Sequence, residues 1–202
     1  PFEGSLARIN VEAREGDLQG IPAEAMDAFR RSRPMLGRNM QRLTMISSWH
    51  AGDHESAAMW RLYLKSDEGV AIRSTVGRLC DSFQGFPDPV YVGAVKYIDY
   101  DRTPIPEANL FWPFVHKRKS FEHEQEVRAV MARMDLPGSM EKLVDVADAG
   151  ENVGIDVLTL VGTVFVAPTA PPWFEELVRS VVHQYGFDIP VARSVLGSDP
   201  LF

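Results

Sequence analysis

The stretch RKSFEHEQEVRAVMA, residues 118–132, changes character halfway along its length. It opens with charged residues, carries a glutamate at every second position from 122 to 126, and ends in an apolar run. If extended backbone begins near His123, successive side chains alternate between the two faces of a strand. One face then holds Val127, Ala129 and Met131, and the other holds Glu124, Glu126, Arg128 and Val130. The pattern predicts a strand that carries charge onto an otherwise apolar sheet.

Side chains two residues apart on one strand face lie about 6.5–7 Å apart, so two carboxylates and a guanidinium would line up. The preceding residues 111–121 are interpreted as a helix with Pro113 in its first turn, which brings Lys117 and Arg118 to the same region. The segment therefore predicts a pocket wall of alternating charge. The alternative interpretation is a solvated surface whose ion pairs contribute little to stability.

The remaining sequence alternates between helical and extended patterns without a strict strand–helix–strand repeat. This mixture favours an α+β fold, one domain over residues 1–202, with a single curved mixed sheet flanked by helices. Strands 90–100, 126–132 and 163–168 are expected to share that sheet. Helices are expected at 22–33, 53–65, 74–83, 111–121 and 172–185, and further strands at 42–49, 68–75 and 190–196.

Composition limits the classes of partner. The chain has 202 residues and a formal net charge of −7, which argues against duplex nucleic acid as an electrostatic partner. No apolar run of about 18 residues is present, so no membrane span is expected. The single cysteine, Cys80, excludes an internal disulfide and fits a reducing compartment, so we expect a cytoplasmic protein.

A second unusual stretch is SSWHAGDHESAAMWRLY, residues 47–63. Apolar residues surround nearly the whole predicted helix 53–65, which predicts a buried helix capped by Asp53. Glu55 should be mostly buried and held by backbone N–H groups or a basic partner. His50 and His54 have no evident third ligand, and we assign no metal ligands in the chain.

Several segments together resemble one family. They are SSWH, ESAAMWRLY, EGVAIRST, VKYIDY, KRKSFEHEQEVRAV, VFVAPTAPPWFEELV and VARSVL, in that order. The chain resembles the bacterial family called domain of unknown function 2971, which carries no established activity. The opening PFEG resembles the end of a family segment that follows an earlier strand and helix, so we expect that upstream part to be missing here.

This family plan is similar, more distantly, to ADP-ribosyltransferase-like domains. In those enzymes a late glutamate orients the nicotinamide ribose and stabilises an oxocarbenium-like transition state, while aromatic residues stack on nicotinamide. The resemblance implies NAD as the cofactor class, with Glu124 or Glu126 as that glutamate and Tyr63 or Trp60 as the aromatic residue. The candidate catalytic residues are Glu124, Glu126 and Tyr63. With the basic and aromatic residues singled out from the sequence itself, the candidate ligand-binding residues are Trp49, His50, Trp60, Arg73, Lys117, Arg118 and Arg128.

Three functional hypotheses follow. The first is a cytoplasmic domain that binds or acts on NAD or a nucleotide, with the basic residues meeting phosphates. The second is a non-catalytic interaction module in a phage-defence or toxin–partner setting. The third is a metal-dependent hydrolase with Glu122, Glu124 and Glu126 as Mg²⁺ ligands, although the chain lacks the compact aspartate cluster that such sites favour.

Overall fold

The computed structural model describes residues 4, 6–17, 22–106, 108–133, 150 and 152–197. Helices and strands both contribute, and the sheets are mixed, so the α+β class is confirmed. The chain divides into two compact units. The first unit comprises Pro1–Ala51 and Asp88–Asn152, and the second comprises Gly52–Pro87 and Val153–Phe202. Each unit is thus assembled from two separate stretches of sequence.

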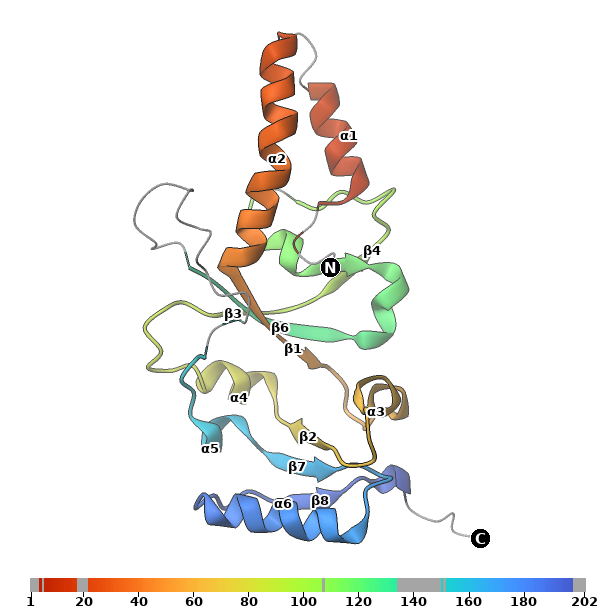
Figure 1. The fold of residues 1–202 in the computed structure, drawn as a ribbon, viewed down its shortest axis with the longest axis vertical. Coiled ribbons are helices and arrows are strands. Elements are labelled where there is room, and N and C mark those ends of the chain that lie inside the picture. The colour runs from red at the N-terminus through yellow and green to blue at the C-terminus, as the bar shows by residue number, and fades with distance from the viewer. Residues whose placement is uncertain are drawn as a thin grey trace. The chain divides into compact units, whose positions relative to one another are not determined.

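In the first unit, helix α1 spans Arg8–Asp17, and helix α2 spans Ala23–Leu43. Strand β1, Thr44–His50, follows α2 without a connecting loop (Figure 1). The predicted start of α2 after Pro22 is confirmed, but the helix continues beyond residue 33. It passes through Pro34, whose ring removes one backbone hydrogen bond without ending the helix.

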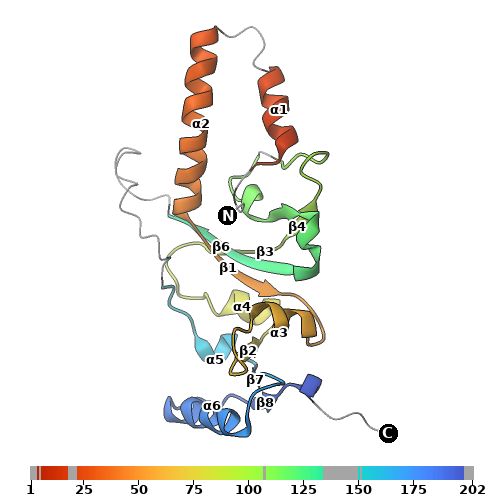
Figure 2. The same ribbon diagram turned by 45° about the vertical axis from the view of Figure 1, so that its right-hand side comes forward.

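The main sheet of the first unit has the order β1–β6–β3, and both pairings are antiparallel. Strand β3 spans Tyr91–Ala94, and β6 spans Glu126–Ala132, which confirms the predicted strand. Strand β6 lies between its two neighbours (Figure 2). Residues 126–131 are all buried, because a central strand is covered on both edges as well as on its faces.

The predicted strand 90–100 is interrupted. The backbone N–H of Val95 still donates to Glu126, but the chain then leaves the main sheet. Strand β4, Lys96–Ile98, pairs in parallel with β5, His116–Arg118, in a separate two-stranded sheet. The apolar pattern of residues 90–100 thus predicted extended backbone correctly. It did not predict that β3 pairs with β6 while β4 pairs with β5.

The predicted helix 111–121 is wrong. The structure has the short 3₁₀ helix η1 at Trp112–Phe114, then β5, then the 3₁₀ helix η2 at Lys119–Glu124. Pairing with β4 requires extended backbone at residues 116–118, and this tertiary interaction overrides the local helical pattern. The interruption determines where the basic side chains of this segment point.

The sheet of the second unit has the order β2–β7–β8, with an antiparallel and a parallel pairing. Its strands are β2, Val70–Arg73, β7, Thr163–Val166, and β8, Val191–Arg193. Helix α6, Pro172–Gln184, lies alongside β8 (Figure 1). The prediction that strands 90–100, 126–132 and 163–168 share one sheet is therefore wrong, because apolar runs do not encode their partner strands.

Short elements complete the second unit. They are α3, Ala57–Tyr63, α4, Val76–Asp81, α5, Val157–Leu160, and η4, Val195–Gly197. Helix α3 is shorter than predicted, and Ser56 caps it in place of Asp53. The expected full burial of α3 is also wrong. Trp60 packs against the core around Val166, whereas Leu62 and Tyr63 remain 59% and 66% exposed.

Candidate functional site

Four charged side chains meet at the start of β6 in the first unit. We call Lys117, Glu124, Glu126 and Arg128 the charged cluster. The ammonium Nζ of Lys117 donates to Glu124 and lies 2.7 Å from Oε1 of Glu126. The guanidinium Nε of Arg128 lies 2.6 Å from Oε2 of Glu126. The sequence predicts that the Glu126 carboxylate lies within reach of Arg128, Arg73 or Lys117. The structure shows contacts with Lys117 and Arg128, and Arg73 belongs to the second unit.

The charged cluster has a buried end and a solvent end. The side chains of Arg128 and Glu126 are 1% and 8% exposed, and Arg128 also donates through Nη1 to the carbonyl of Phe114 at 2.6 Å. The side chains of Glu124 and Lys117 are 11% and 17% exposed. Lys117 and Glu124 are therefore the more exposed members of the cluster, whereas the Arg128 guanidinium is buried against Glu126 and the Phe114 carbonyl.

The backbone between the two glutamates has an unusual conformation. Gln125 has a φ of 42°, and it is the one non-glycine residue with positive φ in the described part of the chain. This left-handed residue ends η2 and lets both neighbouring carboxyl groups reach the Lys117 ammonium. Residues other than glycine rarely adopt this region, and such residues concentrate at functional sites.

The two carboxyl groups have opposite pKa shifts. Burial raises the pKa of Glu124, and its hydrogen bond with Glu126 raises that pKa further, against the opposing effect of Lys117. Burial alone would also raise the pKa of Glu126, but hydrogen bonds from Arg128, Glu124 and Lys117 hold it well below its usual range. Glu126 is thus the fixed anion of the pair, and Glu124 is the carboxyl group that takes a proton more readily.

Lys117 keeps its positive charge within the cluster. Burial alone would lower its pKa, but its hydrogen bonds to Glu124 and Glu126 outweigh that effect and raise the pKa. Its ammonium also lies 4.8 Å from the ring centroid of Phe121, within cation–π range. Phe121 is 37% exposed, so it provides an aromatic surface beside the solvent end of the cluster.

Two further predicted ligand residues, Trp49 and His50, lie at the end of β1, and His50 shares the sheet face of Glu126 while Trp49 is on the other face. His50 is directly opposite Glu126 in the strand register, and its Nδ1 lies 2.7 Å from the carbonyl oxygen of Glu124. Its side chain is otherwise exposed. Trp49 is half-buried, and its indole N–H donates to Ser47 at 3.1 Å.

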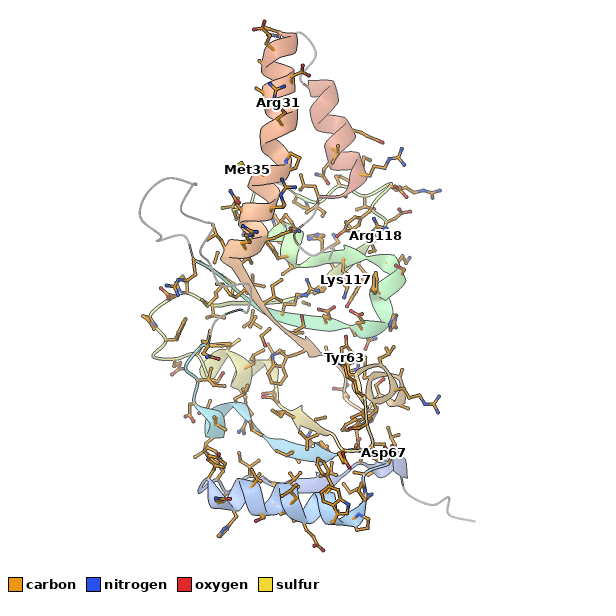
Figure 3. The ribbon with its side chains drawn as sticks, in the orientation of Figure 1. Arg31, Met35, Tyr63, Asp67, Lys117 and Arg118 are labelled. Carbon is orange, nitrogen blue, oxygen red and sulfur yellow. The ribbon has the colours of Figure 1, made fainter. Side chains whose placement is uncertain are left out.

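Arg118 is separated from the charged cluster. Adjacent residues of a strand point to opposite faces, and Figure 3 labels Lys117 and Arg118 at neighbouring positions of β5. The Arg118 guanidinium lies 5.5 Å from the ring centroid of Tyr100, on the side away from the two glutamates. The predicted helix would have placed Lys117 and Arg118 on roughly one face. Because these residues form the strand β5, their side chains point to opposite faces.

Trp60, Tyr63 and Arg73 belong to the second unit. The Trp60 indole donates to Glu55 at 3.2 Å, while the Arg73 guanidinium lies 5.1 Å from the Phe165 ring centroid. These contacts of Trp60 and Arg73 are contacts within the second unit. Glu55 also accepts a backbone hydrogen bond from Val195 at 3.2 Å, so the predicted backbone partner of this carboxylate is confirmed, although the residue is half-buried.

Two contributors to the site were missed by sequence reasoning. The hydroxyl oxygen of Tyr97 accepts from the backbone N–H of Glu126 at 2.8 Å, which anchors the first residue of β6. The strained Gln125 was also missed, because nothing in its residue type predicts positive φ. Glu122 is exposed on η2, and among the described residues no three His, Cys, Asp or Glu side chains converge as a metal site.

Comparisons with family models, with curated proteins and with solved structures find no match for this chain. The resemblance to domain of unknown function 2971 and to ADP-ribosyltransferase-like domains therefore stays a prediction. Within the described residues, no helix combines the length and apolar character needed to cross a membrane.

Proposed function

We propose that the first unit binds a nucleotide or NAD-type molecule and acts on it through the Glu124–Glu126 pair. The observation that carries the proposal is the pair of carboxyl groups of Glu124 and Glu126 held on one Lys117 ammonium, and their pKa values shift in opposite directions. Pairs of titratable groups whose environments separate their pKa values commonly divide the acid and base roles of a site.

Each member of the pair has its own role in the proposal. Glu124 is the more exposed carboxyl group, and it exchanges a hydrogen bond or a proton with a ribose hydroxyl. Glu126 stays anionic behind it and orients Glu124 through Lys117, which contacts both. Phe121 provides exposed aromatic surface beside the Lys117 ammonium for a base or nicotinamide ring.

The test is binding and turnover of NAD, ADP-ribose and AMP. We expect ligand to raise the melting temperature of the wild type, and Glu124→Gln to lower NAD turnover by about 10²–10⁴-fold with little change in melting. Glu122→Gln is the matched control, because Glu122 is exposed in the same segment. Absence of both a thermal shift and NAD turnover in the wild type would reject the proposal.

A second candidate is the non-catalytic interaction module. It is favoured by the row Trp173, Leu177 and Val181, which repeats every four residues on α6 and remains largely exposed. Such apolar rows often mark protein-binding surfaces. Sedimentation velocity tests a second copy of this chain as the first partner. Association that rises with concentration and is lost in Leu177→Glu supports this function, whereas a wild type that stays monomeric argues against self-association.

A further inference from the structure

One cavity of the first unit lies apart from the charged cluster. Its volume is about 670 Å³, which is within the range of small-molecule sites. It lies between the first turn of α1, the chain from Ile98 to Asp101, and the start of η2. The full lining is Leu6, Arg8, Val11, Ile98, Asp99, Tyr100, Asp101, Arg118, Lys119 and Ser120.

The lining combines three cations with two carboxylates, in a chain whose net charge is −7. Arg118 and Lys119 are consecutive and both exposed at the cavity. Among the described residues, none forms an ion pair with the Lys119 ammonium, whereas Arg8 is paired with Glu12 at 2.8 Å. A guanidinium and an ammonium group that line the same cavity are well suited to a phosphate dianion.

Hydrogen bonds within the chain also hold Tyr100 and Asp99 of the cavity lining in place. The hydroxyl of Tyr100 donates to the carbonyl of His116 at 3.1 Å, so the phenol is fixed and its ring supports the Arg118 guanidinium. The carboxylate of Asp99 accepts a hydrogen bond from the backbone N–H of Asp101 at 3.0 Å, which orients the Asp99 side chain. Carboxylates at the edge of a cavity accept hydrogen bonds from the hydroxyl groups of a polyol.

From this arrangement we propose that the cavity binds a phosphorylated sugar, either free or as part of a nucleotide. Arg118 and Lys119 bind the phosphate, Asp99 and Asp101 accept hydrogen bonds from sugar hydroxyls, and Leu6, Val11 and Ile98 cover the apolar edge. The site is separate from the Glu124–Glu126 pair, because Arg118 and Lys117 point to opposite faces of β5. The proposal does not depend on that pair.

The experiment measures the affinity of the full chain for ribose 5-phosphate, AMP, inorganic phosphate and ribose by calorimetry. We expect ribose 5-phosphate to bind more tightly than either phosphate or ribose alone. Tighter binding of AMP than of ribose 5-phosphate identifies a nucleotide as the source of the sugar phosphate, and the reverse order identifies the free sugar phosphate. Both orders support the site. No binding of ribose 5-phosphate at about millimolar concentration overturns it.

Variants locate the site. Lys119→Ala should weaken ribose 5-phosphate binding about tenfold, and Arg118→Ala/Lys119→Ala should weaken it further, because each removes charge-assisted hydrogen bonds. Asp101→Asn should weaken ribose 5-phosphate but not inorganic phosphate. Arg61→Ala/Lys65→Ala is the matched control, since both residues are exposed in the second unit. Unchanged affinity in both Lys119→Ala and the double variant overturns the proposal.

Glu124→Gln separates this site from the proposed function. Adding Lys119→Ala to Glu124→Gln should weaken ribose 5-phosphate binding by the same factor as adding it to the wild type, because Glu124 does not line the cavity. An effect of Lys119→Ala that disappears when Glu124→Gln is present would contradict two separate sites and overturn the inference. Loss of NAD turnover in Glu124→Gln with retained ribose 5-phosphate binding supports both.

Discussion

The guanidinium of Arg128 and the carboxylate of Glu126 form a nearly solvent-free ion pair on one face of β6, with Nε and Oε2 2.6 Å apart. A buried charge is tolerated when its partners are complete, and here Lys117 and the Phe114 carbonyl complete them. The pair is therefore a structural element of the first unit as well as the base of the proposed site. Removing either partner leaves the other charge buried.

Glu126→Gln should destabilise the protein by about 3–5 kcal/mol, because Arg128 then stays buried without its counter-charge. Chemical denaturation by urea measures this change in the free energy of unfolding. Glu122→Gln, at an exposed position of the same segment, should change it by less than about 0.5 kcal/mol. A melt of Glu126→Gln that matches the wild type would contradict a structural role for the pair.

Glu124→Gln should change the free energy of unfolding by less than about 1 kcal/mol, because glutamine resembles the protonated carboxyl group that burial favours at this position. Lys117 keeps Glu126 as its partner in this variant. The same urea titration measures the difference between the two variants. Equal destabilisation by Glu124→Gln and Glu126→Gln would show that the two carboxyl groups contribute equally to the free energy of unfolding.

The stability of the protein should depend on pH in opposite senses at the two glutamates. The contribution of Glu126, whose folded pKa is lowered, is present above the unfolded pKa of about 4.3 and declines as pH falls toward the folded value. The contribution of Glu124, whose folded pKa is raised, is present below about 4.3 and is lost as pH rises through the folded value.

This pH dependence is measured by unfolding the wild type and both variants between about pH 3 and pH 7. The stability difference between wild type and Glu126→Gln should shrink as pH falls. The wild type should lose stability relative to Glu124→Gln as pH rises, because the variant has no carboxyl group to ionise at this position. If the free energy of unfolding changed with pH in the same way in all three proteins, the opposite pKa shifts would be contradicted.

Gln125 should tolerate glycine better than a β-branched residue. Gln125→Gly removes the steric cost of positive φ and adds chain entropy to the unfolded state, so we expect a net change within about 1 kcal/mol. Gln125→Val should cost about 1–3 kcal/mol, since valine is strongly disfavoured in this conformation. Thermal denaturation compares them with Gln184→Val on exposed helical backbone, for which we expect a much smaller loss.

Asn10 should be an important residue of the first unit despite its distance from the charged cluster. Its amide Nδ2 donates to the carbonyl of Ile105 at 2.8 Å, and the N–H of Ile105 donates to Oδ1 at 2.7 Å. Asn10→Ala leaves both buried backbone groups without these partners, at a cost of about 2–4 kcal/mol in the free energy of unfolding. Glu12→Ala on the exposed face of α1 is the control, with less than about 0.5 kcal/mol expected.

Local sequence determined several elements of this protein correctly. Period-two alternation located β6, and it placed Glu126 and Arg128 on the same face of that strand. Pro22 directly precedes α2, and Gly186, with a φ of 75°, follows the end of α6, because the backbone preferences of proline and glycine act without tertiary partners. The charge pattern also predicted a basic partner for Glu126 among Arg128, Arg73 and Lys117, and the structure shows Arg128 and Lys117 in contact with it.

Only the tertiary structure decided which strands pair and which side chains share a site. Parallel pairing with β4 forced residues 116–118 out of the predicted helix, turned Lys117 toward the glutamates and placed Arg118 on the opposite face. Sheet partners lie far apart in sequence, and an apolar strand pattern fits any partner of similar length. The sequence by itself determined the alternating charges of β6, and long-range strand pairing decided which of them meet.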